Sequence, residues 1–184
     1  MLSFDEIQGM TEKYFAALSG PPTAGVLKSY TYADTFDAEI RGWTHYWNDI
    51  FLPQVRLDEN LVKALIASES SFHSDTSIPS GEGDGRARGL MQVTDRTMHI
   101  LGDHHGELKN YLVCFDHEKL LNPSANVCAG VRWLFRTMEI ARSKLGCDVT
   151  WIDAVAQYKG KLGLAPPVKE MEIFIHFCTC LFQG

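Results

Sequence analysis

One glutamate, Glu69, combines a chemically useful side chain with unusual neighbours. Leu65 and Ile66 precede it by four and three residues and Phe72 follows it by three, so on a helix these apolar side chains lie on its face. Apolar neighbours disfavour a charged carboxylate, and so does the partial negative charge at the end of a helix. Both effects favour the protonated form, which suits a general acid that protonates the leaving oxygen in glycoside cleavage. A surface glutamate or an ion-paired glutamate is the alternative interpretation.

A Ser-, Gly- and Pro-rich segment at residues 73–88 follows Glu69 and carries further carboxylates. Asp75 lies six residues after Glu69, and Asp84 lies between two glycines. Two carboxylates about 6.5–9.5 Å apart can cleave a glycoside with inversion, because one acts as the acid and the other activates water. Asp84 and Asp75 are therefore candidates for a second carboxylate. The alternative is a solvated loop, since Ser, Gly and Asp favour turns.

The elements that must position these residues are predicted to be helices. Apolar spacing of helical period recurs along the chain and convincing strand alternation does not, so we predict an all-α, mostly α-helical fold. The expected helices, with the residues that cap or stop them, are 4–18 before Gly20-Pro21-Pro22, 36–51, a helix from the N-cap Asp58 to the Ser68-Glu69-Ser70 run, Thr94 to Leu101, Pro123 to Leu145 before Gly146, 151–158 after Thr150, and a last apolar helix after Pro166-Pro167. Residues 1–55 are expected to form an N-terminal helical layer, packed on the same domain as a catalytic part at 56–184.

Composition bounds the function classes. The 184 residues are 45% apolar and 22% charged, which is typical of one globular domain. The net charge of −6 argues against a nucleic-acid-binding surface. No apolar run is long enough to span a membrane, and no signal peptide is visible at the start. Five cysteines in no metal or disulfide pattern are interpreted as mostly reduced thiols: Cys114, Cys128, Cys147, Cys178 and Cys180.

Two further groups of residues carry less specific chemistry. His104 and His105 are metal-ligand types, but adjacent side chains on a regular element do not readily face one ion, so we expect no metal and no cofactor. Four tryptophans could stack on sugars, although their helical spacing favours core packing: Trp43, Trp47, Trp133 and Trp151.

Four segments, in order, resemble the soluble lytic transglycosylase and goose-type lysozyme superfamily. They are 64–72 (ALIASESSF), 89–93 (GLMQV), 122–134 (with NP, NV and GVRWL) and 154–160 (AVAQYKG). The resemblance covers about residues 58–165 and none of 1–55. It implies a lysozyme-like α-helical fold and cleavage of the β-1,4 bond between N-acetylmuramic acid and N-acetylglucosamine in peptidoglycan.

The resemblance also implies site residues. Glu69 corresponds to the single catalytic acid, which in the transglycosylases also acts as base during closure of a 1,6-anhydro product. Ser70, Met91, Gln92 and Tyr158 correspond to residues that bind substrate: the serine lies beside the reacting sugar, the GLMQ side chains and the tyrosine line the cleft, and the glutamine amide suits an acetamido group. Without the resemblance, Met91 and Gln92 would be interpreted as a buried helix start, and Tyr158 as core.

The chain departs from the family pattern at two points. Lys159 stands where the family usually has Asn after the tyrosine, which replaces an amide with a charge, and we expect this lysine to be solvated. Glu69 and Gln92 are 23 positions apart, which is longer than in ordinary transglycosylases. The extra length is the segment that contains Asp75 and Asp84.

Three functional hypotheses remain open from the sequence. The first is lytic transglycosylation with one glutamate; the others are an inverting muramidase that uses a second carboxylate, and an inactive glycan-binding module. The substrate places the action in the periplasm or cell wall. With no visible signal peptide, we expect an antibacterial toxin delivered by a dedicated secretion system, a phage component, or an excised domain. A delivered toxin implies an immunity or inhibitor protein as a partner besides peptidoglycan.

Overall fold

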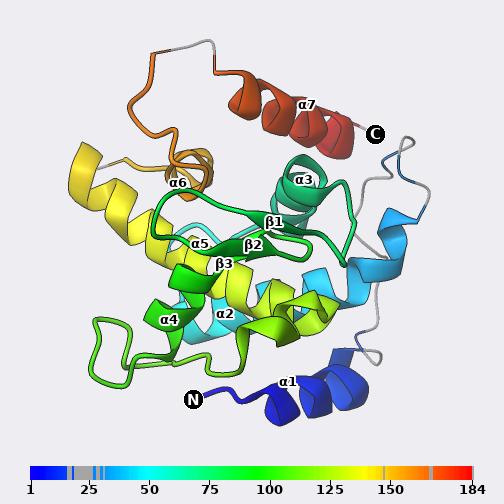
Figure 1. The fold of residues 1–184 in the computed structure, drawn as a ribbon. Helices are drawn as coiled ribbons and strands as arrows, with labels where there is room; N and C mark the ends of the chain where they lie inside the picture. The colour runs from blue at the N-terminus through cyan, green and yellow to red at the C-terminus, as the bar shows by residue number, and fades with distance from the viewer. Residues whose placement is uncertain are drawn as a thin grey trace.

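The computed structural model describes residues 1–15, 18, 27, 30, 32–146, 148–165 and 168–183. Its α-helices are α1 (Phe4–Met10), α2 (Asp37–Phe51), α3 (Glu59–Ser70), α4 (Asp95–Gly102), α5 (Pro123–Leu145), α6 (Trp151–Tyr158) and α7 (Lys169–Gln183). A π-helical turn continues α1 over Thr11–Phe15, and two 3-10 helices span Ala33–Phe36 and His117–Leu121. The predicted mostly α-helical fold is confirmed (Figure 1). The Gly20-Pro21-Pro22 stop lies outside the described residues.

Capping side chains begin the helices where the sequence predicts. Asp58 accepts a hydrogen bond of 2.7 Å from the backbone N–H of Asn60, and Thr94 accepts one of 3.1 Å from that of Thr97. Asn122 caps α5 ahead of Pro123, and Thr150 forms a reciprocal capping box with the third residue of α6. These side chains satisfy backbone N–H groups that a helix start leaves unpaired, so the predicted starts of α3, α4, α5 and α6 are confirmed.

The long helix α5 runs through the core, and α1, α2, α4 and α6 pack against it (Figure 1). Two fully buried tryptophans of α2 form hydrogen bonds with residues of α5. The indole N–H of Trp43 donates to the hydroxyl of Ser124 at 2.8 Å, and that of Trp47 donates to the carbonyl of Cys128 at 3.0 Å. The core interpretation of these tryptophans is confirmed, and their rings offer no surface to a sugar.

A small antiparallel sheet occupies much of the segment expected to be a loop. It contains β1 (Ser77–Pro79), β2 (Arg86–Arg88) and β3 (Val93–Thr94), with β2 in the middle. In register, Ile78 pairs with Ala87 and Ala87 with Thr94. Strands of two or three residues are too short to show the alternation by which a sequence reveals a strand, so this sheet was missed. It lies over α5 and beside α3 (Figure 1).

The last helix, α7, packs along α3 (Figure 1). Its buried side chains include Phe174 and Leu181. Cys178 lies half-buried in this contact, and burial raises the pKa of its thiol to about 12. The four cysteines that the structure describes form no disulfide with one another, and Cys147 lies outside the described residues.

Among the described helices, none combines the length and the apolar composition that crossing a membrane requires.

Candidate active site

Glu69 is the penultimate residue of α3, at the edge of the core. Leu65 and Ile66, one helical turn before it, are fully buried, and Phe72 is nearly so. The helix ends at Ser71, and Ser71 and Phe72 both adopt left-handed backbone conformations, with φ of 52° and 64°. The Glu69 side chain keeps 19% of its surface exposed. It is therefore accessible from one side while its helix is anchored on the other.

Two tyrosines hold the end of α3. The hydroxyl of Tyr32 donates to the backbone carbonyl of Ser71 at 2.8 Å, and that of Tyr30 donates to the Ser71 hydroxyl at 3.2 Å. Left-handed backbone at residues other than glycine costs free energy and persists only where its surroundings fix it. These two hydrogen bonds supply part of that restraint next to Glu69.

Lys159 is not the solvated lysine expected from the sequence. Its Nζ lies 2.5 Å from the Oε1 of Glu69, and only 6% of its side chain is exposed. Lys159 directly follows the last residue of α6, so the end of this helix places the ammonium group beside the end of α3. The alternative interpretation of Glu69 as an ion-paired glutamate thus describes the geometry.

Tyr158, the residue before Lys159, binds the backbone rather than a side chain. Its hydroxyl donates to the carbonyl oxygen of Met91 at 2.7 Å. Burial raises the pKa of this phenol well above its usual value, and the negative charge of Glu69 raises it further. The phenol is therefore a neutral, permanent hydrogen-bond donor close to Glu69.

Removing this hydroxyl gives a first testable prediction. Tyr158→Phe leaves the ring in place and the Met91 carbonyl without its donor, so we expect the free energy of unfolding to fall by about 1–2 kcal/mol. Chemical denaturation measures the change. Tyr14→Phe is the matched control, because Tyr14 is exposed and its substitution should change stability by less than about 0.5 kcal/mol. Equal stability of the Tyr158→Phe variant and the unsubstituted protein would show that the hydrogen bond contributes nothing.

The GLMQ segment forms the turn between β2 and β3, which we call the 89–92 turn. Gly89 and Gln92 have positive φ values of 69° and 49°. A Cβ atom on Gly89 would lie 2.3 Å from both the Asn126 amide nitrogen and the Leu120 carbonyl oxygen, so only glycine fits there. The interpretation of this segment as a helix start is wrong, because α4 begins only at Asp95.

Asn126, fully buried on α5, organises the 89–92 turn, a role that its position in the sequence does not predict. Its Nδ2 donates to the carbonyl oxygens of Arg88 at 2.8 Å and Leu120 at 2.9 Å, and its Oδ1 accepts from the backbone N–H of Met91 at 2.7 Å. An amide among the apolar residues of a core helix is the feature that could have revealed this, because a buried amide requires partners.

The predicted substrate-binding residues divide into three that support the turn and one, Gln92, that has an acceptor without a donor. The hydroxyl of Ser70 donates to the Leu90 carbonyl at 2.8 Å, which ties α3 to the turn. Met91 is fully buried against Gly130, where a Cβ atom would lie 2.4 Å from the methionine sulfur. The structure thus places Met91 in the core and not on a cleft surface, because the small residue of α5 admits its side chain.

Gln92 differs from these supports. Its Nε2 donates to the Gly89 carbonyl at 2.8 Å, and its Oε1 meets no donor among the residues that the structure describes. A buried amide oxygen without a donor costs free energy, so this acceptor is a candidate for a ligand N–H group.

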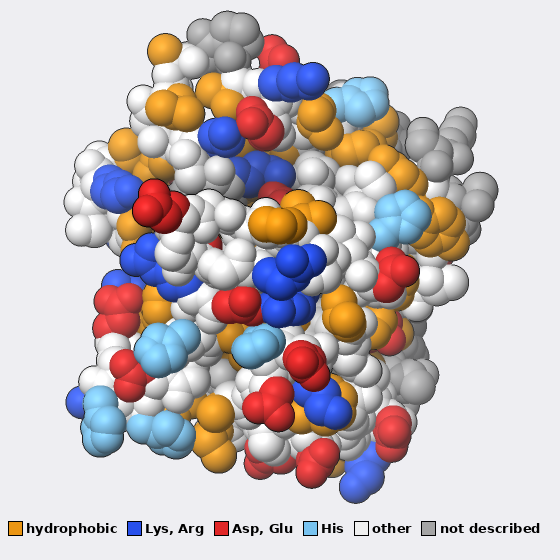
Figure 2. All heavy atoms as spheres, in the orientation of Figure 1, with side chains coloured by type: hydrophobic (Ala, Val, Ile, Leu, Met, Phe, Trp, Pro, Cys, Tyr) orange, Lys and Arg blue, Asp and Glu red, His pale blue; other side chains and the backbone are white. Residues whose placement is uncertain are grey.

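The two candidate second carboxylates lie on the segment between α3 and β2. Asp84 occupies the turn between β1 and β2, and its Oδ1 lies 3.4 Å from a guanidinium nitrogen of Arg96. Asp75 is exposed in the segment between α3 and β1. Arg88 also forms an ion pair, with Asp95. Basic side chains gather over the small sheet with carboxylates beside them (Figure 2).

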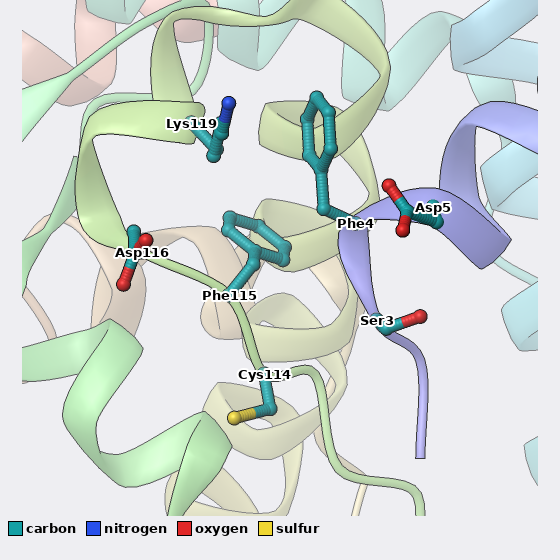
Figure 3. Close-up of a pocket in the computed structure, with 7 residues that line it drawn as sticks. All are labelled: Ser3, Phe4, Asp5, Cys114, Phe115, Asp116 and Lys119. Carbon is teal, nitrogen blue, oxygen red and sulfur yellow. The ribbon is translucent and has the colours of Figure 1, made fainter.

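Two hollows of the surface lie away from Glu69. The larger, of about 780 Å³, lies between the end of α2, α5 and the start of α6 and is lined by residues such as Phe51, Met138 and Trp151. The smaller, of about 370 Å³, lies between the start of α1 and residues 114–119. There the rings of Phe4 and Phe115 meet edge to face, and the ammonium group of Lys119 lies 4.9 Å from the Phe4 ring (Figure 3). Glu69 lines neither hollow.

Within the part of the chain that the structure describes, no three His, Cys, Asp or Glu side chains are close enough to hold a metal ion.

Together, these contacts join three helices around one turn. Ser70 of α3, Asn126 of α5 and Tyr158 of α6 each bind the backbone of residues 88–91, and Lys159 binds Glu69 across the same junction. Segments up to 90 residues apart in the sequence thus surround one partly exposed carboxylate.

Comparison with known proteins gives one match. The family model described as "Transglycosylase SLT domain" matches residues 52–163, a range that contains α3, the sheet, α4, α5 and α6. Glu69, the 89–92 turn and Lys159 all lie within it. No curated protein and no solved structure matches the chain significantly.

Proposed function

Because the chain belongs to the transglycosylase SLT domain family, we propose that it cleaves peptidoglycan glycan strands by lytic transglycosylation, with Glu69 as its catalytic residue. The bond is the β-1,4 linkage between N-acetylmuramic acid and N-acetylglucosamine. The observation that carries the proposal is the single carboxylate, partly exposed at the end of α3 and surrounded by the four segments of the resemblance.

One carboxyl group suffices for both steps of the reaction. Protonated Glu69 donates its proton to the glycosidic oxygen while the bond from C1 of the muramyl sugar to that oxygen breaks. The resulting carboxylate then accepts the proton of the sugar's own C6 hydroxyl as O6 bonds to C1. The product is a 1,6-anhydro ring, and Glu69 ends the cycle protonated, so no water and no second carboxylate is consumed.

The surrounding residues position this chemistry. We assign the Oε1 of Gln92 as an acceptor for an acetamido N–H of the glycan, which its lack of a donor supports. The other three residues contribute indirectly, because they fix the 89–92 turn. The hydroxyl groups of Ser70 and Tyr158 donate to carbonyl groups of this turn, and the side chain of Met91 anchors it in the core. Residues 1–55 are proposed to be a helical layer that supports this catalytic part.

Delivery as an antibacterial toxin and inhibition by an immunity protein remain predictions from the sequence.

The mass of the products tests the proposed reaction. Purified peptidoglycan digested with the protein should release muropeptides with 1,6-anhydro-muramyl ends, and Asp84→Asn and Asp75→Asn variants should release the same products at similar rates. An inverting muramidase would instead release products heavier by one water and lose activity with one of these substitutions. A glycan-binding module would release nothing.

A further inference from the structure

The contact between Lys159 and Glu69 is a feature that the proposed reaction does not use. A lysine with 6% of its side chain exposed requires a partner, because an unpaired buried charge is costly. Its partner is the only carboxylate assigned to the reaction, at 2.5 Å.

Other charged and titratable groups near this pair come from α6 and α7. The Tyr158 phenol faces Glu69 from the end of α6 and stays neutral. On α7, Glu170 pairs with Lys161 at 3.0 Å. The pKa of Glu170 is lowered by hydrogen bonds to its own backbone and to Lys161, and the charge of Lys159 is the smallest contribution. Glu170 thus has its own cation, and Lys159 acts mainly on Glu69.

We propose that Lys159 is a positioning residue that holds the Glu69 carboxylate in an ion pair at the end of α6, so that glycan cleavage requires this ion pair to open. The proposal rests on the proposed function, because it concerns the proton that Glu69 must donate. A carboxylate bound to an ammonium group has no proton to give to the glycosidic oxygen. Removing the ammonium group therefore removes an obstacle to proton donation, and the pH profile of cleavage detects this change.

The direction of the effect of removing Lys159 follows from charge alone. Without the adjacent cation, the ionised form of Glu69 loses its stabilisation, so the carboxyl group keeps its proton up to a higher pH. We expect the alkaline limb of the kcat/KM profile to move upward by about one pH unit, at the low end of the range for a close opposite charge. At a pH on the former limb, this shift corresponds to a rate about tenfold higher.

The experiment compares Lys159→Met, Lys159→Gln and Lys159→Arg with the unsubstituted protein. The pH dependence of kcat/KM is measured on soluble, uncrosslinked glycan strands, and the Glu69 carboxyl signal is followed by ¹³C NMR over the same pH range, identified by its absence in Glu69→Gln. Lys161→Met is the matched control, because Lys161 lies two residues away and pairs with Glu170. The two neutral variants should move both curves upward, whereas Lys159→Arg and Lys161→Met should leave them near their original positions.

The two readouts separate this proposal from the proposed function. An unmoved NMR titration of Glu69 in both neutral variants overturns the role of Lys159, even if the protein cleaves glycan. A titration that moves upward in a protein that releases no glycan products supports the role of Lys159 and overturns the proposed function. Having two neutral variants keeps the test valid if one of them fails to fold.

Discussion

Glu69→Gln is expected to lower the rate of peptidoglycan cleavage by about 10²- to 10⁴-fold, the usual contribution of a general acid. The amide keeps the size of the side chain but has no acidic proton for the leaving oxygen and accepts none from the C6 hydroxyl. Since Glu69 is the single carboxyl group in both steps, no other group replaces it. The release of soluble muropeptides from purified cell walls over time measures the rate.

Controls distinguish this loss from misfolding. Glu69→Gln also breaks the ion pair with Lys159 and leaves a buried ammonium group with a neutral partner, so the melting temperature and near-ultraviolet circular dichroism must be recorded. Glu82→Gln is the matched control, because Glu82 is exposed in the turn between β1 and β2. A folded Glu69→Gln protein that lyses cell walls at the original rate would contradict the assignment of Glu69.

Asn126→Ala is expected to have the largest effect on stability, a loss of about 3–5 kcal/mol in the free energy of unfolding. The substitution leaves the Met91 N–H and the carbonyl groups of Arg88 and Leu120 without partners inside the core. Each unsatisfied buried group costs about 1–3 kcal/mol. The 89–92 turn also loses its support from α5, so cleavage should fall even where the protein remains folded.

Urea denaturation measures this effect. An unchanged m-value would show that the variant and the unsubstituted protein expose the same amount of surface when they unfold. The exposed Asn110 provides the matched control, because Asn110→Ala removes the same amide from the surface. A change of less than about 1 kcal/mol for Asn126→Ala would mean that water or a shifted backbone satisfies the three groups, and the support assigned to this residue would be wrong.

Features that depend on neighbours in the sequence could be predicted closely. A helix start is fixed by a capping side chain within three residues of the backbone N–H that it binds, so Asp58, Thr94 and Thr150 indicated the starts of α3, α4 and α6 correctly. The apolar surroundings of Glu69 also follow from local spacing, because Leu65 and Ile66 lie one helical turn away.

Features that depend on contacts between distant segments could not be predicted. Lys159 is 90 residues from Glu69, and only the meeting of α6 with α3 turns a long flexible cation into a buried partner of the carboxylate. The role of Asn126 similarly requires the turn that it binds. The contact of Asp84 with Arg96, 12 residues further along the chain, likewise depends on how the small sheet meets α4.

The measurement that tests the central claim most directly is the mass of the muropeptides released from purified peptidoglycan by the unsubstituted protein and by Glu69→Gln. The account predicts 1,6-anhydro-muramyl products from the first and a loss of at least about 100-fold in their release by the second. Products heavier by one water, or equal release by both proteins, would contradict lytic transglycosylation by Glu69.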